Sequence, residues 1–348
     1  MNKNKYITID GGWGEGGGQI LRTSLSLSMC LGKEVVIKNI RSGRKKPGLM
    51  RQHLTCVLAA QEICDASVTG AELGSQEVRF SPGNIKAGKY KFSIGTAGST
   101  SLVFQTILPA LIVADKDSEV CFEGGTHNMC APSFEFINKC FIETLKGMNI
   151  TVKCKLNRYG FYPNGGGQWT SKISRPVDLK ALQLVERGKQ KERCATAFIS
   201  QIPTGVSKRE LDEVKRKLEW NSDEMIEKVV DSYGPGNLIS LKLAYENTTQ
   251  LFEAVAQRGL SAERVAMKAI SKLVRYKNSS AVVGEYLADQ LLIPMVLTAG
   301  GSFVTHVLSA HAKTNLDVIH HFLKDTISVK KLDDDLFEVV VRGVHLAS

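Results

Sequence analysis

Apolar and polar residues follow two different periods along the N-terminal part of the chain. Residues 19–32 and 49–66 carry apolar side chains at helical spacing, whereas residues 33–40 show the short β-branched pattern of a strand. Glycines precede the first helix, and the charged loop RSGRKKPG separates the strand from the second helix. These patterns predict a unit of β-α-β-α-β type, in which the helices cover one face of a small sheet.

The same order of elements returns twice further along the chain. A second copy begins near Phe92 and a third near Gly284, although residue identity between the copies is low. In the third copy we expect a strand over residues 302–308, a loop over 309–314 and a helix over 315–326. The repeat therefore rests on the order of the elements and on the placement of glycines.

A segment with a different pattern lies between the second and third copies. Its strand candidates are CATAFISQI and NLISLKLAYEN, and its helix candidates are SKRELDEVKRKLEW and SAERVAMKAISKLVRY. We interpret residues 184–277 as an inserted α+β domain, which leaves a discontinuous main domain over residues 1–183 and 278–348. The sequence thus predicts a mixed α/β (α+β) fold with one repetitive domain and one smaller insert.

Charge and cysteine content narrow the class of protein. Lys and Arg number 45 against 35 Asp and Glu, a net charge of +10, which is compatible with a polyanionic partner or simply with a basic surface. The eight cysteines form no C-x-x-C pair, which argues against a zinc ribbon or a disulfide framework. The stretch MNKNKYITIDGG has no apolar signal region, and no apolar run is long enough to cross a membrane. We therefore expect a reduced, cytoplasmic protein.

Polar residues occupy the loop between the second strand and the second helix of every copy. These residues are Arg41, Arg44, Lys45 and Lys46 in copy one, His127 in copy two and His311 in copy three. If the copies pack around a common centre, a cationic loop beside a loop histidine would suit a site that handles phosphate groups. The plainer interpretation is that these loops are polar because loops are exposed.

The glycine-rich turn DGGWGEGGGQILR offers a candidate anion site. Its glycines would let the backbone approach a ligand, and the helix that follows presents free N–H groups. Glu15 could hold a divalent metal together with phosphate oxygens, and Arg22 could bind a phosphate. A tight structural turn is the alternative, because the P-loop pattern G-x-x-x-x-G-K-[ST] is absent.

Two further stretches carry aromatic side chains beside polar ones. In VGEYLADQLLIP, Tyr286, Asp289 and Gln290 share one helix face, where a ring could stack on a purine and a carboxylate could bind a ribose. An ordinary helix surface explains the same pattern. In YGFYPNGGGQW, dense glycines favour close packing at least as much as contact with a ligand.

His311 is a candidate nucleophile for nucleotidyl transfer. A neutral histidine has a free lone pair near pH 7, so it could attack the α-phosphate of ATP and hold AMP covalently. The patterns of two competing chemistries, G-x-S-x-G and K-x-D-G, are absent. We expect Thr314 and Asn315 to cap the helix that follows the loop.

Several ordered motifs together resemble the RNA 3′-terminal phosphate cyclase family over nearly the whole chain. They are GEGGGQILR, IRSGRKKPGLMRQHL, GTAGSTSLVFQTILPAL, GFYPNGGGQ, GEYLADQLLIP and HAKTN. The resemblance implies three β-α-β-α-β-β repeats, similar to the C-terminal domain of translation initiation factor three, and a thioredoxin-like insert. One departure is Tyr159, which separates Arg158 from Gly160 where many members place a basic residue directly before the glycine.

The resemblance also implies a reaction in three steps. ATP adenylylates a histidine, AMP moves to an RNA 3′-phosphate, and the neighbouring 2′-OH attacks to give a 2′,3′-cyclic phosphate. The implied cofactors are ATP and a divalent metal, Mg²⁺ or Mn²⁺, and the implied partner is RNA with a 3′-phosphate end, with a homo-oligomer left open. The implied site residues are the nucleophile His311, the nucleotide contacts Glu15 (also the metal ligand), Arg22, Arg41, Arg44, Gln52 and Gln105, and the adenosine pocket Pro132, Phe252, Tyr286, Asp289 and Gln290.

Two other functions compete with the cyclase. The family includes a non-catalytic branch that acts in rRNA processing and ribosome assembly, whose members lack the histidine and much of the nucleotide pocket. An enolpyruvyl transferase shares the repeat architecture and would need neither ATP nor a histidine nucleophile. Because His311, Tyr286 and Asp289 are all present, the sequence favours the enzyme.

Overall fold

The first repeat forms a small mixed sheet with two helices. The computed structural model describes residues 6–346, so residues 1–5, which begin the stretch without an apolar signal region, lie outside it. Strands β1 and β2 are parallel, and β4 lies antiparallel between β2 and β3. The elements in chain order are β1 (Ile7–Asp10), α1 (Gln19–Leu31), β2 (Val35–Lys38), α2 (Arg51–Cys64), β3 (Ser67–Thr69) and β4 (Val78–Ser81).

The second repeat has the same strand order. Its sheet runs β5-β6-β8-β7, with the first pair parallel and the others antiparallel. A short π-helical turn interrupts its second helix, which is otherwise continuous in direction. The elements are β5 (Lys89–Ser93), α3 (Thr100–Ile112), β6 (Ser118–Gly124), α4 (Phe134–Phe136), η1 (Ile137–Phe141), α5 (Ile142–Leu145), η2 (Lys146–Met148), β7 (Val152–Arg158) and β8 (Gly167–Ile173).

The third repeat is split by the inserted segment. Its sheet runs β9-β14-β16-β15, which is again the order first, second, fourth, third, but β9 precedes the insert in the chain. The mixed α/β fold expected from the sequence is thus confirmed, with one strand order in three sheets. The elements are β9 (Leu182–Leu184), α8 (Glu285–Leu297), β14 (Gly301–Thr305), α9 (Ala310–Phe322), β15 (Ile327–Asp333) and β16 (Leu336–Val341).

The segment between β9 and α8 has a sheet and an apolar cluster of its own. The sheet runs β11-β10-β12-β13, and Trp220 and Tyr276 belong to the cluster beneath α6 and α7. The boundaries 184–277 and the thioredoxin-like arrangement stay predictions. The elements are β10 (Gln190–Ser200), α6 (Gly205–Leu218), η3 (Ser222–Glu224), β11 (Met225–Val229), β12 (Gly236–Tyr245), β13 (Thr249–Val255) and α7 (Ala262–Asn278).

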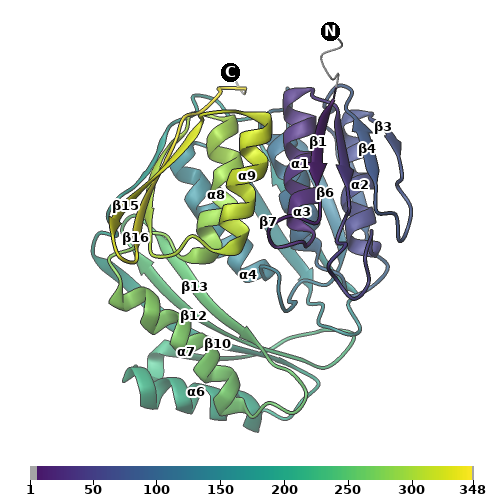
Figure 1. The fold of residues 1–348 in the computed structure, drawn as a ribbon. Helices are drawn as coiled ribbons and strands as arrows, with labels where there is room; N and C mark the ends of the chain where they lie inside the picture. The colour runs from purple at the N-terminus through teal and green to yellow at the C-terminus, as the bar shows by residue number, and fades with distance from the viewer. Residues whose placement is uncertain (1–5, 347–348) are drawn as a thin grey trace.

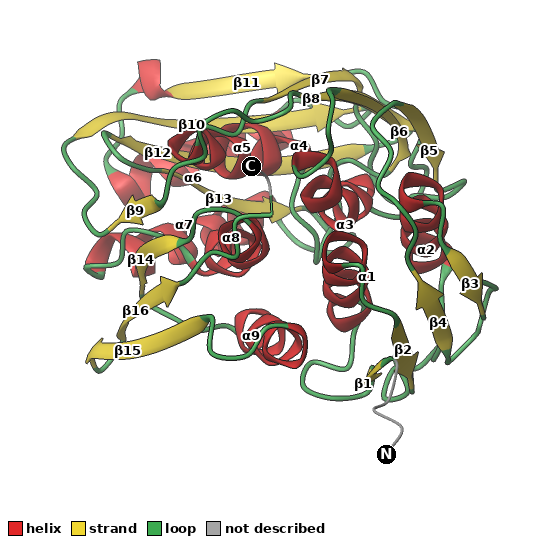
Figure 2. Cartoon of the chain, turned by 90° about the horizontal axis from the view of Figure 1, so that it is seen from above, coloured by secondary structure: helices red, strands yellow, loops and turns green. Residues whose placement is uncertain are grey.

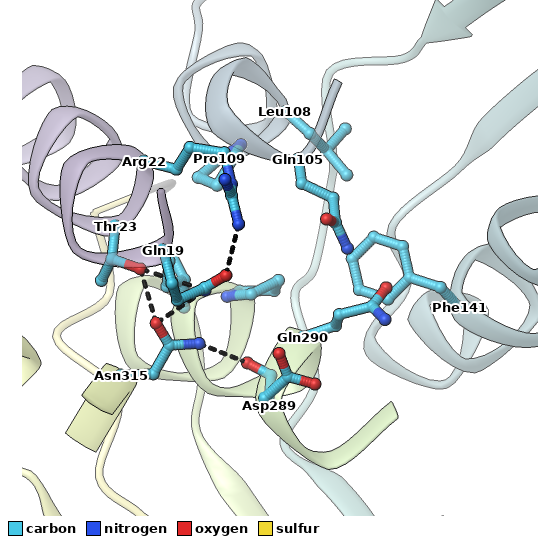
Figure 3. Close-up of a pocket in the computed structure, with 12 residues that line it drawn as sticks. Gln19, Arg22, Thr23, Gln105, Leu108, Pro109, Phe141, Asp289, Gln290 and Asn315 are labelled. Carbon is cyan, nitrogen blue, oxygen red and sulfur yellow. Dashed lines mark hydrogen bonds between the residues drawn. The ribbon is translucent and has the colours of Figure 1, made fainter. Parts of the chain in front are cut away.

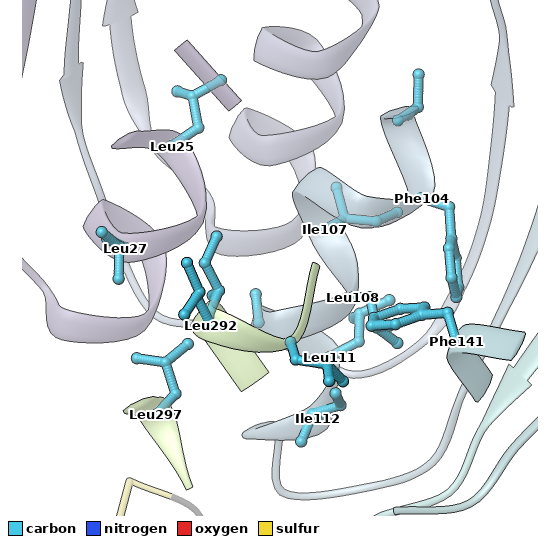
Figure 4. Packing of buried hydrophobic residues seen from close by; sticks show 14 of the residues in the cluster. Leu25, Leu27, Phe104, Ile107, Leu108, Leu111, Ile112, Phe141, Leu292 and Leu297 are labelled. Carbon is cyan, nitrogen blue, oxygen red and sulfur yellow. The ribbon is translucent and has the colours of Figure 1, made fainter. Parts of the chain in front are cut away.

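Helices α1, α3, α8 and α9 gather in the centre of the three repeats, with the sheets outside them (Figures 1 and 2). Leu25 and Leu27 of α1, Phe104 and Ile107 of α3 and Leu292 of α8 are fully buried in this helical core (Figure 4). Burial of such side chains contributes about 1.5–3 kcal/mol each. This packing brings elements from the two ends of the chain together. Among the described residues, none of the helices combines the length and hydrophobicity needed to span a bilayer.

The helix after β14 begins earlier than the sequence pattern predicts. His311 lies in the first turn of α9 and not in a loop, because Ser309 caps the helix by accepting a hydrogen bond from the Ala312 amide at 3.1 Å. Thr314 and Asn315 were expected to cap the helix, but both lie buried inside it. Serine followed by alanine, histidine and alanine favours a helix start, and this local preference outweighs the loop prediction.

Candidate functional site

Glu15 and His311 meet where the glycine-rich turn approaches the start of α9. The His311 Nδ1 atom lies 3.0 Å from Oε2 of Glu15, and Arg44 donates a hydrogen bond of 2.7 Å to Glu15 Oε1. Gly14 and Gly16 flank Glu15 at φ of +58° and +59°, a region that non-glycine residues rarely adopt. A Cβ on Gly14 would also lie 2.8 Å from the Thr314 hydroxyl, so this approach needs glycine.

The pairing changes the acidity of both side chains. Contact with His311, followed by the charges of Arg44 and Arg22, lowers the pKa of Glu15 despite its partial burial. The Glu15 carboxylate raises the pKa of His311 above its ordinary value, with a smaller contribution from Asp289. Because Nδ1 faces Glu15, the other ring nitrogen of His311, Nε2, is the one available to a ligand.

The His311 pKa can be tested directly by replacing Glu15. We expect the Glu15→Gln substitution to lower the pKa of His311 toward the ordinary histidine value, because it removes the nearest negative charge. Titration of ring resonances by NMR in protein free of nucleotide and metal measures this shift, and His320, exposed on the same helix, serves as an internal reference. An unchanged His311 titration in the variant would show that Glu15 is not its partner in solution.

Arg22 is a nearly buried cation at the wall of a pocket. It projects from α1 with 8% of its surface exposed, and its Nη2 atom donates to Gln19 Oε1 at 2.7 Å. Burial lowers the pKa of Arg22, yet a guanidinium stays charged because its reference pKa lies far above neutral. Gln105, Asp289 and Gln290 line the same pocket (Figure 3). A desolvated guanidinium facing a cavity favours an anionic ligand.

His53 lies next to this cation. A Cβ added to Gly18 would fall within 2.7 Å of both the His53 ring and the Arg22 guanidinium, so both side chains lie close to Gly18. Burial, followed by the charge of Arg22, lowers the pKa of His53 to about 3. His53 is therefore neutral at pH 7 and adds no positive charge beside Arg22.

A buried amide network fixes the three central helices that carry the site. The Oδ1 atom of Asn315 on α9 accepts hydrogen bonds from Thr23 Oγ1 at 2.5 Å and Gln19 Nε2 at 2.8 Å, both on α1. Its Nδ2 atom donates to the Asp289 carbonyl on α8 at 3.0 Å (Figure 3). One side chain thus ties together the helices that carry Arg22, Asp289 and His311.

Asp289 is held in a poorly solvated position. Burial raises the pKa of its carboxyl to about 7, although His311 and Arg22 oppose the shift. The predicted adenosine residues do not line a single cavity: Asp289 and Gln290 line the pocket beside Arg22, whereas Tyr286 and Phe252 line a second one with Lys272. Both cavities are lined by α8, where Tyr286 and Gln290 are one turn apart and Gln290 Nε2 donates to the Tyr286 carbonyl at 2.6 Å.

The pH dependence of stability should change when Asp289 is replaced. A carboxyl whose pKa is raised to about 7 on folding contributes stability below about pH 4 that is lost as the pH rises through 7. We therefore expect Asp289→Asn to be more stable than the wild type at pH 8 and the difference to shrink toward pH 4. Thermal unfolding without nucleotide measures this, with the exposed Asp115→Asn as control. Lower stability of Asp289→Asn at pH 8 would contradict the assignment.

Three other predicted site residues form hydrogen bonds with the protein backbone or with neighbouring side chains. Arg41 donates to the carbonyls of Lys46 and Gly48 within its loop, at 2.6 and 2.9 Å. Gln52 accepts a hydrogen bond of 2.7 Å from the Ser99 amide, and the Pro132 carbonyl accepts one from Ser101. Their roles toward a nucleotide stay predictions.

Sequence reasoning missed the polar residues that support the site. They are Gln19, Thr23, His53 and Lys272, together with Asn315 in its bridging role. Gln19 and Thr23 were recognisable as polar positions at i and i+4 on either side of Arg22 in the same helix. Lys272 could not be found in this way. Its ammonium lies 5.0 Å from the centre of the Tyr286 ring, but the two residues belong to different helices and only the fold brings them together.

The comparisons with known proteins agree on one family. The family described as RNA 3′-terminal phosphate cyclase matches residues 13–329. Proteins named RNA 3′-terminal phosphate cyclase from Koribacter versatilis and Ectopseudomonas mendocina are 46% and 44% identical. The first alignment covers 93% of this chain and 92% of that relative, and the second covers 98% and 99%.

A solved structure, the enolpyruvyl transferase NikO from Streptomyces tendae, aligns with 98% of this chain and 49% of its own chain. Its TM-score of 0.37 and its identity of 9% are too low to support an argument. The sequence relatives carry the assignment, because the family match spans His311, Glu15 and both pockets. This chain belongs to the RNA 3′-terminal phosphate cyclase family.

Proposed function

We propose that this enzyme converts an RNA 3′-terminal phosphate to a 2′,3′-cyclic phosphate with ATP, through a covalent histidine–AMP intermediate. The observation that carries the proposal is the pairing of His311 Nδ1 with Glu15, which leaves Nε2 free near enough to the buried Arg22 for its charge to act on the ring. The names of relatives that match nearly the whole chain support the same reaction.

In the first step the His311 Nε2 lone pair attacks the α-phosphate of ATP. A P–N bond forms, the bond from the α-phosphorus to the bridging oxygen breaks, and pyrophosphate leaves with that electron pair. Glu15 stabilises the positive charge that develops on the imidazole. Arg22 and Arg44 lie where a guanidinium can offset negative charge on the phosphate oxygens.

In the second step a 3′-phosphate oxygen of the RNA attacks the same phosphorus, and the P–N bond breaks to release neutral His311. The RNA end then carries AMP through a pyrophosphate linkage. In the third step the neighbouring 2′-hydroxyl attacks the RNA phosphorus, loses its proton, and AMP leaves. AMP is required because a free 3′-phosphate has no good leaving group, and the adenylylated end supplies one.

The two cavities lined by α8 would bind the nucleoside of ATP. Asp289 and Gln290 offer polar atoms for the ribose, while the rings of Tyr286 and Phe252 offer apolar surface for adenine. Tyr286 is 44% exposed, so a face of its ring is accessible to a base. Burial raises the pKa of Tyr286 to about 12, which keeps its hydroxyl neutral and able to donate.

A divalent metal, Mg²⁺ or Mn²⁺, fits the site only with phosphate oxygens as partners. The described residues hold no cluster of three or more His, Cys, Asp or Glu side chains suited to a metal. Glu15 Oε2 lies 3.0 Å from His311 Nδ1 but makes no well-aligned hydrogen bond, so an ion could share this oxygen with the histidine. A bound ion would neutralise charge on the phosphates, and Glu15 would hold it, as Mg²⁺ is often held by a carboxylate and substrate oxygens.

The proposal is tested by incubating the protein with α-³²P-labelled ATP and a divalent metal. We expect the label on the protein, acid-labile and alkali-stable as a phosphoramidate is, and its discharge by a 3′-phosphorylated oligoribonucleotide but not by a 3′-hydroxyl one. Failure to acquire label with either metal would contradict the mechanism. It would favour the non-catalytic role in rRNA processing instead.

A further inference from the structure

Two exposed tyrosines stand where the second repeat meets the inserted segment. Tyr162, in the glycine-rich loop between β7 and β8, is 73% exposed, and Tyr233, between β11 and β12, is 61% exposed. The two loops join through a bridge between Tyr159 and Ser232, with a hydrogen bond of 3.2 Å from the Tyr159 amide to the Asp231 carbonyl. Figure 2 shows β11 beside β7 and β8 at this edge of the molecule. The proposed reaction uses neither ring.

The backbone beneath these rings is closely packed. Gly165 and Gly166 have φ of +64° and +67°, and a Cβ on Gly165 would lie 2.8 Å from the Ala97 Cα. Arg158 donates to the Gly166 carbonyl at 2.6 Å, and its guanidinium carbon lies 4.0 Å from the Tyr233 ring centre. A cation that stacks on a tyrosine and is hydrogen-bonded to the backbone holds the ring in place. The ring then loses less conformational entropy when a ligand binds.

The loop of residues 94–99 contacts both this edge and residues close to the site. Ala97 of that loop packs on Gly165, and its carbonyl accepts a hydrogen bond from Asn128 at 2.5 Å. Ser99 of the same loop donates its amide to Gln52, and the next residue, His53, lies close to Gly18 as Arg22 does. The loop therefore lies between the exposed tyrosines and the pocket for phosphate.

The chemistry around the tyrosines fits a nucleic acid strand. Arg158 and Lys228 supply positive charge, and Lys228 Nζ lies 5.8 Å from the Tyr159 ring. Glu227 and Asp231 are exposed acidic residues in the same segment. Exposed rings interleaved with cations are the usual means of binding single-stranded RNA, because every base has a face that can stack and every phosphate attracts a cation.

We propose that Tyr162 and Tyr233 form a stacking platform for the body of the RNA substrate, several nucleotides before its 3′-phosphate. This inference rests on the proposed function, since it assumes that the 3′-end occupies the site beside His311. The platform adds affinity without base sequence preference, because stacking accepts every base.

RNAs of two lengths distinguish an effect on the platform from an effect on the reaction centre. We expect the double variant Tyr162→Ala/Tyr233→Ala to bind a 3′-phosphorylated oligoribonucleotide of about ten nucleotides roughly tenfold more weakly or worse. If the platform binds RNA several nucleotides before the 3′-end, a 3′-phosphorylated dinucleotide does not engage it, and discharge of the variant's enzyme–AMP adduct by the dinucleotide should match the wild type. The double variant Tyr162→Phe/Tyr233→Phe keeps the rings and should bind the longer RNA normally.

Tyr6→Ala is the matched control, because Tyr6 is also a surface tyrosine beneath an arginine, with the Arg79 guanidinium carbon 5.2 Å from its ring centre. Unchanged binding of the longer RNA by the alanine double variant overturns the proposal, and so does an equal loss for both lengths. Fluorescence anisotropy measures this binding without ATP. If the wild-type protein binds the RNA but never acquires AMP, the proposed reaction is refuted. The test of the platform is still valid in that case, because it measures binding alone.

Discussion

The His311→Asn variant is expected to acquire no AMP from labelled ATP, with a loss of at least a thousandfold relative to the wild type. Asparagine resembles histidine from Cβ to the δ position and can keep a polar contact with Glu15. Its amide nitrogen, however, has no basic lone pair that could attack phosphorus. The α9 helix should survive the change, since His311 is half-exposed and Ser309 supplies the cap. Label transfer to protein, followed after acid precipitation, measures the effect.

The matched control is His321→Asn. His321 is exposed near the other end of the same helix and has no part in the site, so adduct formation should remain at the wild-type level. Label retained by His311→Asn would assign the nucleophile to another residue. An equal loss in both variants would instead show that the helix tolerates neither change.

The repeated architecture was predictable because local sequence patterns determine it. Each sheet is built from strands and helices close in sequence, and glycines mark the turns, so order alone revealed three units. The exception is β9, whose three residues pair with β14 across the whole insert. A strand of that length carries too little periodicity to be recognised, and only pairing with a distant partner defines it.

The sequence named charged candidates for the site but could not give their geometry. The glycine run and HAKTN led to the prediction of Glu15 and His311, whereas the distance between them follows from the packing of α1 against α9. The i, i+3, i+4 spacing placed Tyr286, Asp289 and Gln290 on one face, yet they line two cavities because neighbouring elements divide that face. Asn315 was misassigned for a related reason: its partners lie on other helices, so a local capping interpretation was the one the sequence offered.

Asn315→Ala is expected to cause the largest loss of stability among substitutions at the site. The side chain is 1% exposed, and its removal takes a hydrogen bond from Thr23 Oγ1, from the Asp289 carbonyl and from Gln19 Nε2, which keeps only a contact of 3.4 Å with Thr23 Oγ1. A buried polar group left unpaired costs about 1–3 kcal/mol, so a loss of about 3 kcal/mol or more in the free energy of unfolding is expected. Denaturant unfolding measures it, and the exposed Lys313→Ala on the same helix should be close to neutral.

A double-mutant cycle with Thr23→Val separates the network from a simple cavity. If Asn315 and Thr23 act through their shared hydrogen bond, the double variant Thr23→Val/Asn315→Ala should lose less stability than the sum of the single variants, by about 0.5 kcal/mol or more. Strict additivity would mean that the bond contributes nothing and that Asn315 only fills space. The coupling bears on the candidate site, because the same side chain joins α8 at the Asp289 carbonyl to α9, the helix that carries His311.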